Sequence, residues 1–164
     1  MNRDAIQKLY AHLDFVWPQI VRIISERDAD VLTKPAPGSG WPDLRNCLAH
    51  LIFAYESWLG FMTARPPTNA GETVRTLAEI DEARASLRGQ VDSLLQSLSD
   101  DDLQEIRTFD IRGEKMPYSY GELLAHVALH ERGHHGDVTT LFWQLGIEAD
   151  TGFDYRWHLG RQPL

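Results

Sequence analysis

The chain has 164 residues, 43% hydrophobic and 24% charged, with a formal net charge of −8 and a single cysteine, Cys47. This composition is typical of one globular domain with its own core, and the acidic balance argues against nucleic-acid binding, which needs a basic surface. One cysteine excludes a disulfide within the chain, and no apolar run reaches the length of a signal peptide or a membrane span, so we expect a cytoplasmic protein that does not enter the membrane.

Three helices are predicted in the first hundred residues, because apolar residues recur there every three or four positions. They cover roughly residues 3–27, 43–63 and 76–98. Pro18 lies inside the first pattern and should kink or split that helix. His12 lies off the apolar stripe, so we expect it to be solvated. In the third helix, Thr76 and Glu79 form a capping box, and Arg84 interrupts an otherwise apolar seam.

A short hairpin or an extended loop is predicted for residues 104–118, where the helical period gives way to alternation. Ser119 and Glu122 then form a second capping box, which opens a fourth helix. The tail of residues 147–164 has three aromatic residues, Phe153, Tyr155 and Trp157. We expect this tail to pack on the helices or on a dimer partner.

Four of the seven histidines gather on the fourth helix: His126, His130, His134 and His135. At about 100° per residue, His134 falls inside the apolar stripe, His130 lies at its edge, and Glu131 points inward beside them. His126 turns further toward solvent, and His135 lies on the other flank. Imidazoles four residues apart can bind one metal ion from a single helix, and neutral imidazole is a common ligand for zinc and nickel. The alternative is a buried polar network with waters.

The segment from His130 to His134 also matches the H-E-x-x-H pattern, in which zincin peptidases use two histidines and a general base. The residues that follow lack the metzincin extension, and no mixed sheet is predicted before the helix. The sequence therefore disfavours a zincin peptidase.

Two separated segments resemble the DinB/YfiT-like superfamily in order and spacing. They are residues 44–50 (LRNCLAH), on the second helix after a Trp-Pro loop, and residues 124–137 (LAHVALHERGHHGD), on the fourth. The resemblance extends over about residues 3–146. It implies an all-α fold: a four-helix bundle with an unusual helix order in residues 1–146, with the hairpin or extended loop before the fourth helix.

The resemblance also implies a divalent metal, often nickel or zinc. Its ligands would be one histidine of the second helix and an H-x-x-x-H pair of the fourth: His50, His130 and His134. His126 matches a histidine often found beside such ligands. Two positions depart from the family pattern: His135 stands where arginine is common, and Asp137 where glutamine is common.

Three histidine ligands leave a coordination position open, and such a metal can acidify a bound water or thiol. Because some members of the superfamily activate a low-molecular-weight thiol cofactor, we expect a thiol-dependent transferase or isomerase acting on a small molecule. A metal-hydroxide hydrolase is the second enzymatic option. The alternative is a noncatalytic metal-bound module for stress response or interaction. Bundles of this family often pair, so we also expect a homodimer.

Several further residues are candidates for the site. Glu131 is a candidate general base or an orienter of an imidazole, and its plainer interpretation is a carboxylate paired with Arg132 or a lysine. Four residues of the second helix and the loop before it are candidates for lining a substrate pocket, although aromatic residues at helical spacing more often belong to the core. They are Trp41, Cys47, Tyr55 and Trp58.

Overall fold

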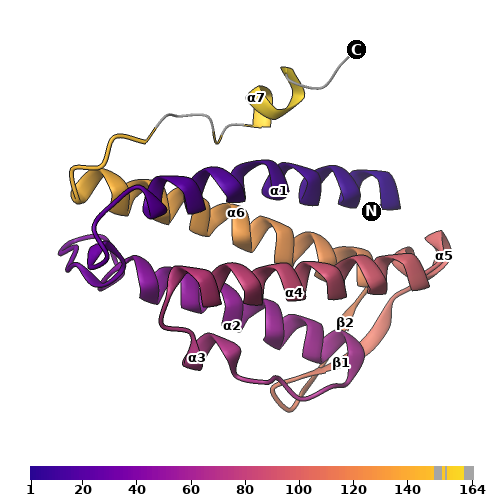
Figure 1. The fold of residues 1–164 in the computed structure, drawn as a ribbon. Helices are drawn as coiled ribbons and strands as arrows, with labels where there is room; N and C mark the ends of the chain where they lie inside the picture. Colours follow the sequence, from indigo (N-terminus) through magenta and orange to yellow (C-terminus); the bar gives the residue numbers. More distant parts are fainter. Residues whose placement is uncertain (150–152, 154, 161–164) are drawn as a thin grey trace.

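The computed structural model describes residues 1–149, 153 and 155–160 (Figure 1). The described part is mostly helical with one small antiparallel sheet, which confirms the helical class and the hairpin predicted from the sequence. Its elements are α1 (Arg3–Ser25), the 3₁₀ turn η1 (Val31–Thr33), α2 (Leu44–Thr63), α3 (Ala70–Thr73), α4 (Leu77–Ser97), α5 (Asp100–Gln104), β1 (Arg107–Ile111), β2 (Glu114–Tyr118), α6 (Tyr120–Gln144) and α7 (Tyr155–Gly160).

The four long helices α1, α2, α4 and α6 pack around one apolar core. Helix α6 contacts both α1 and α2, and α4 contacts the same two helices. Each long helix contributes side chains with no exposed surface, among them Ile6, Leu48, Ile80 and Phe142. Helices α2 and α4 run in the same direction, so the segment between them returns along the molecule and contains α3 (Figure 1).

The helix starts follow the caps predicted from the sequence. Thr76 and Glu79 form a complete capping box at α4, and Ser119 and Glu122 form another at α6. In each box the hydroxyl accepts a hydrogen bond from the backbone N–H of the glutamate, and the glutamate carboxylate accepts one from the backbone N–H of the capping residue. Two otherwise unpaired donors of the helix end are thereby satisfied. Asp43 caps α2 in the simpler way, through its carboxylate. These caps fix where α2 and α6 begin.

The structure differs from two local predictions about the first helix, the split at Pro18 and the exposure of His12. Pro18 lies inside an uninterrupted α1, so it does not split the helix. The neighbouring Trp17 and Ile20 are buried in the core, and this packing outweighs the lost backbone hydrogen bond. His12 is buried instead of solvated, because the ring of Tyr155 on α7 packs against it at 5.1 Å between centroids. Helical periodicity within residues 3–27 contains no information about a segment so distant in the sequence.

The described part of the tail lies against α1. His158 of α7 packs on the ring of Phe15 at 5.2 Å, and Phe153 is buried. The side chain of Trp157, which the sequence singles out, lies outside the described residues. Within the part of the chain that the structure describes, none of the helices has the length and apolar character needed to cross a membrane.

Candidate metal centre

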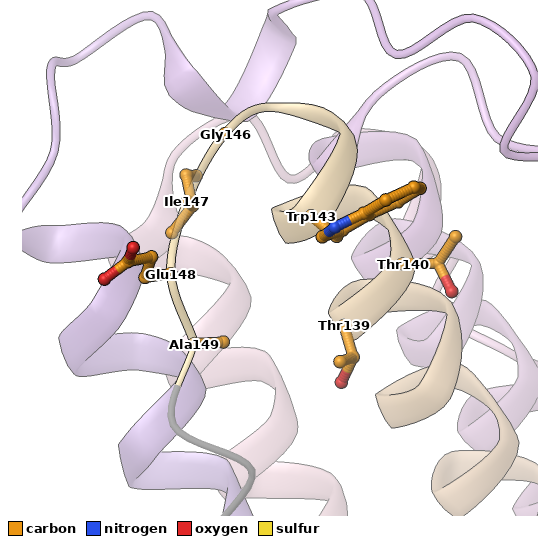
Figure 2. A pocket seen from close by; sticks show the side chains of 7 residues that line it. All are labelled: Thr139, Thr140, Trp143, Gly146, Ile147, Glu148 and Ala149. Atoms are coloured by element: carbon orange, nitrogen blue, oxygen red, sulfur yellow. The ribbon is translucent and has the colours of Figure 1, made fainter.

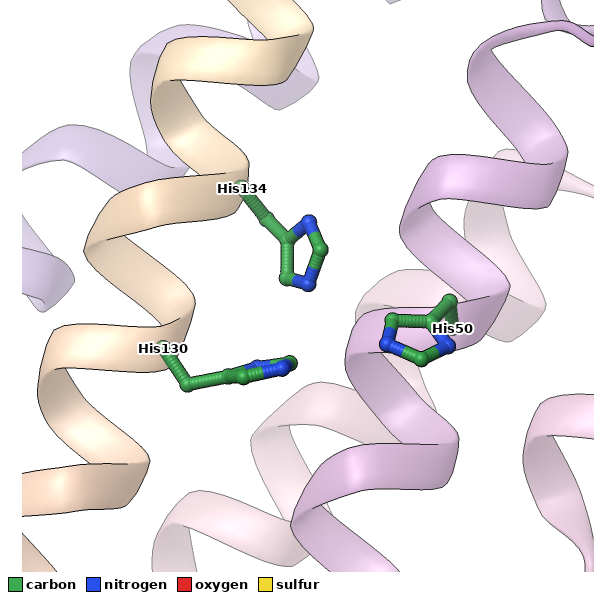
Figure 3. A group of neighbouring side chains, drawn as sticks. All are labelled: His50, His130 and His134. Atoms are coloured by element: carbon green, nitrogen blue, oxygen red, sulfur yellow. The ribbon is translucent and has the colours of Figure 1, made fainter. Parts of the chain in front are cut away.

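Three imidazoles from two helices meet in the gap between α2 and α6. His50 lies in the first half of α2, while His130 and His134 lie one turn apart on α6 (Figure 3). Each offers a ring nitrogen, and the three nitrogens all lie within 4.8 Å of one another. The ring centroids are 4.5 Å apart for the α6 pair, and 5.6 and 5.1 Å from His50 to His130 and His134. The structure thus brings together the three residues that the sequence suggests as ligands.

The surroundings of His130 and His50 favour the neutral imidazole that binds metals. Partial burial, together with the neighbouring His134 and His50, lowers the pKa of His130 to about 4, because burial disfavours the charged form and like charges repel. Burial and His134 also lower the pKa of His50. A neutral imidazole keeps a nitrogen lone pair, and nitrogen ligands of this kind suit zinc and nickel. The chemistry of this donor set therefore fits a divalent transition metal.

The same shift makes the stability of the metal-free protein depend on pH. Between pH 6.5, the ordinary pKa of histidine, and about pH 4, His130 is protonated in the unfolded chain but stays neutral in the folded chain. Protons then favour the unfolded state, so we expect the free energy of unfolding to decrease as the pH falls through this window. Urea denaturation at several pH values in the presence of a chelator measures the slope. His130→Ala should flatten it, and an unchanged slope in that variant would contradict the assignment.

His134 is surrounded by three further side chains of the site. The Nδ1 atom of His134 lies 2.9 Å from Oδ2 of Asp137, and the indole N–H of Trp41 donates to the same oxygen at 3.1 Å. The Trp41 ring also packs on His50 and His134, at 5.1 and 5.4 Å between centroids. The Sγ atom of Cys47 lies 4.0 Å from Nδ1 of His134. Burial and the Asp137 charge raise the pKa of Cys47 to about 12, so it remains a thiol.

The other candidate pocket residues lie in two different places. Trp58 packs edge-on against His126 at 4.4 Å, and His126 lies 6.0 Å from His130, so both residues flank the metal centre along the helices. Tyr55 is buried in the core, where its hydroxyl donates to the carboxylate of Glu131. Trp41, Cys47 and Trp58 therefore lie around the histidines, whereas Tyr55 belongs to a separate polar cluster.

Glu131 is the centre of that buried cluster. Its carboxylate accepts from Nε of Arg84 at 2.9 Å and from Tyr55, and it lies 3.3 Å from Nε2 of His135. Burial by itself would raise the pKa of Glu131, but His135 and the Arg84 guanidinium outweigh it and lower that pKa to about 2. The partner cation is thus Arg84 of α4, and not Arg132 or a lysine as the sequence suggested. A catalytic role for Glu131 remains a prediction.

Arg84 extends this cluster to α1. Its Nη2 atom lies 2.9 Å from Oδ1 of Asp14, and its guanidinium packs over the Trp17 ring at 4.9 Å. Arg88 makes a second ion pair with Asp14, also at 2.9 Å. The cluster therefore joins α1, α2, α4 and α6 on the core side of α6.

Two cavities lie away from the histidines. One, of about 990 Å³, is formed by the end of α6 and the segment that follows it (Figure 2). Its lining residues are Thr139, Thr140, Trp143, Gly146, Ile147, Glu148 and Ala149. The other, of about 460 Å³, lies between the end of α2 and the β hairpin. Neither lining includes His50, His130 or His134.

The sequence by itself suggested no functional role for two residues, Asp137 and Arg84. Asp137 was noted only as a departure from the family pattern, although its spacing of three from His134 places it on the same helix face. Arg84 was noted only as a charge within an apolar seam. A charge at such a position is itself a signal of a buried ion pair, since an unpaired one would be costly.

A known family matches most of the chain. The family model of the DinB superfamily matches residues 12–138, a span that includes all three histidines. The chain therefore belongs to the DinB superfamily, and the resemblance seen in its sequence is confirmed. No curated protein matches the chain.

Proposed function

We propose that this protein is a metal-dependent enzyme whose nickel or zinc ion is held by His50, His130 and His134 and acts on a small molecule. The observation behind the proposal is the convergence of three imidazole nitrogens, from two helices, within 4.8 Å of one another. Three protein ligands leave a coordination position for a substrate. A metal bound there supplies Lewis acidity, which lowers the pKa of a coordinated water or thiol.

The reaction class that we favour is thiol-dependent transfer or isomerisation, and hydrolysis is the second option. The chain itself offers one thiol, Cys47, which is fully buried and has a pKa of about 12. A buried protonated thiol is a poor nucleophile. The reactive thiol would therefore be a low-molecular-weight cosubstrate from solution. Trp41 covers His50 and His134 on one side, so that cosubstrate would reach the metal past His126 and Trp58.

A second candidate function is a noncatalytic metal-bound module. The observation in its favour is a second group of possible ligands, Cys47, His134 and Asp137, which shares His134 with the first. A fourth protein ligand from that group would close the coordination position. We also infer the four-helix order of DinB bundles and a homodimer, and the support for the dimer is that bundles of this family often pair.

Elemental analysis of the purified protein tests the metal site. Wild type should contain one equivalent of a divalent metal, or bind one on addition of zinc or nickel, whereas His50→Ala and His134→Ala should contain none. His126→Ala is the matched control and should keep its metal, because His126 lies at the edge of the cluster. A wild-type protein that binds no stoichiometric metal under any of these conditions would falsify the proposal.

Cobalt substitution then distinguishes an enzyme from a closed site. The Co²⁺ form is titrated with cysteine or glutathione as a probe thiol, and the near-ultraviolet spectrum is recorded. An open site should give the charge-transfer absorption of a cobalt–sulfur bond when the thiol is added. The same titration of His50→Ala should give no such absorption. A spectrum that already shows four protein ligands and does not respond to either thiol would support the noncatalytic module.

A further inference from the structure

Asp137 and His134 form a fixed pair on α6. They are three residues apart on one face of the helix, and Oδ2 of Asp137 lies 2.9 Å from Nδ1 of His134. Figure 3 shows the other ring nitrogen of His134 pointing toward the imidazoles of His50 and His130. The two nitrogens of His134 thus have different surroundings, a carboxylate on one side and two imidazoles on the other.

The chemistry of the pair decides which nitrogen has the proton. A carboxylate only accepts hydrogen bonds, so Nδ1 of His134 must donate to Asp137. A neutral imidazole has a single N–H, and Nε2 then keeps its lone pair. The thiol of Cys47 is a weaker partner for Nδ1, because its sulfur lies 4.0 Å away. The free lone pair of His134 therefore lies on the side of His50 and His130.

The same carboxylate oxygen holds a second group. The indole N–H of Trp41 donates to Oδ2 at 3.1 Å, while the indole ring packs on His50 and His134. Trp41 belongs to the loop before α2, and Asp137 belongs to α6. One oxygen thus links the loop that leads into α2 with the helix that provides the other two imidazoles.

We propose that Asp137 is a positioning residue: it fixes His134 in the tautomer that presents Nε2 to a metal, and it anchors Trp41 against the site. This inference rests on the proposed metal site. Carboxylates that orient ligand histidines in this way typically strengthen metal binding by 10–100-fold. Glutamine, which is common here in the family resemblance, lacks the charge that makes this hydrogen bond strong.

The tautomer can be read in the metal-free protein. Nitrogen chemical shifts of the histidine rings, recorded at mildly alkaline pH, distinguish a protonated ring nitrogen from an unprotonated one. Wild type and Asp137→Asn should show the N–H of His134 at Nδ1, because the amide oxygen still accepts. Asp137→Ala should show a mixture of both tautomers. The matched control is Asp28→Ala, at an exposed aspartate in the turn after α1, and it should leave the spectrum unchanged.

Metal affinity is the second measurement. In competition titrations with zinc, Asp137→Ala should bind about 10–100-fold more weakly than wild type, Asp137→Asn should be intermediate, and Asp28→Ala should match wild type. The Co²⁺ spectrum of Asp137→Ala at saturation should keep its wild-type form, because the metal loses no ligand. A changed spectrum would overturn the inference in favour of direct coordination by Asp137.

The remaining outcomes separate this inference from the proposed function. Wild-type affinity together with an unchanged tautomer in Asp137→Ala would overturn the positioning role while leaving the metal site intact. Failure of wild type to bind metal would overturn the proposed function. The tautomer measurement would then still show whether Asp137 controls the His134 ring, since it needs no metal.

Discussion

Replacing Arg84 with methionine should lower the free energy of unfolding by about 3–5 kcal/mol, because it leaves a buried carboxylate without its cation. Arg84 is 5% exposed and Glu131 is fully buried. Their ion pair at 2.9 Å connects α4 to α6, and the variant would leave Glu131 with only Tyr55 and His135. Urea denaturation of the metal-free protein at neutral pH measures the change.

An exposed ion pair provides the matched control. Arg22 and Glu26 on α1 pair at 3.1 Å with both side chains largely in water, so Arg22→Met should cost under about 1 kcal/mol. The double variant Arg84→Met/Glu131→Leu should recover much of the loss, because a buried ion pair can often be replaced by apolar residues at little cost. If Arg84→Met were no more costly than Arg22→Met, the buried pair would not be a main support of the fold.

Acid should act on the same pair. The pKa of Glu131 falls from its usual 4.5 to about 2 in the folded protein, so the pair contributes its full stability above 4.5. That contribution is lost as the pH falls toward 2, because the unfolded chain takes up the proton first. In a plot of the free energy of unfolding against pH, the decrease below pH 4.5 should therefore be less steep for Arg84→Met/Glu131→Leu than for wild type.

Saturating zinc should raise the stability of the wild-type protein by a large increment. A ligand at 100 times its Kd adds about 2.7 kcal/mol to the free energy of unfolding if it binds only the folded state. For a domain of this size that corresponds to a rise in Tm of roughly 5–10 °C. Melting curves with and without zinc measure it, and the increment should vanish in His50→Ala and His134→Ala.

Magnesium is the control for this experiment. It prefers oxygen ligands in octahedral geometry, so a cluster of three imidazoles should not bind it, and Tm should stay unchanged. His126→Ala should keep most of the zinc increment. Equal stabilisation of wild type and His134→Ala would place the bound zinc at another site and remove the support for this cluster.

The local features of the fold were predictable from the sequence. Periodicity identified the long helices, and the capping boxes at Thr76 and Ser119 placed the starts of α4 and α6. The change of period before Ser119 identified the hairpin, which pairs Arg107 with Tyr118 at its open end. These features depend on residues within a few positions of one another, where propensity and hydrogen bonding are local.

Most of the features that the sequence did not predict are long-range. The position of Arg84 in an apolar seam indicates burial, but its partner Glu131 lies 47 residues away. Helical geometry turned Glu131 inward without indicating what it would meet. His12 was assigned to solvent because the tail that covers it lies at the other end of the chain. The spacing on α6 predicted the pair of His130 and His134, whereas His50 was suggested by family resemblance alone.

On helix α6, His130 belongs to the candidate metal site and the adjacent Glu131 belongs to the buried ion pair. This arrangement has a consequence for metal uptake. Adjacent residues lie about 100° apart around a helix, so fastening Glu131 to Arg84 also fixes the rotation of α6 about its long axis. That rotation determines where His130 and His134 point. The directions of these two imidazoles are therefore established when the chain folds, so an ion bound at the proposed site would meet preorganised side chains with little conformational entropy left to lose.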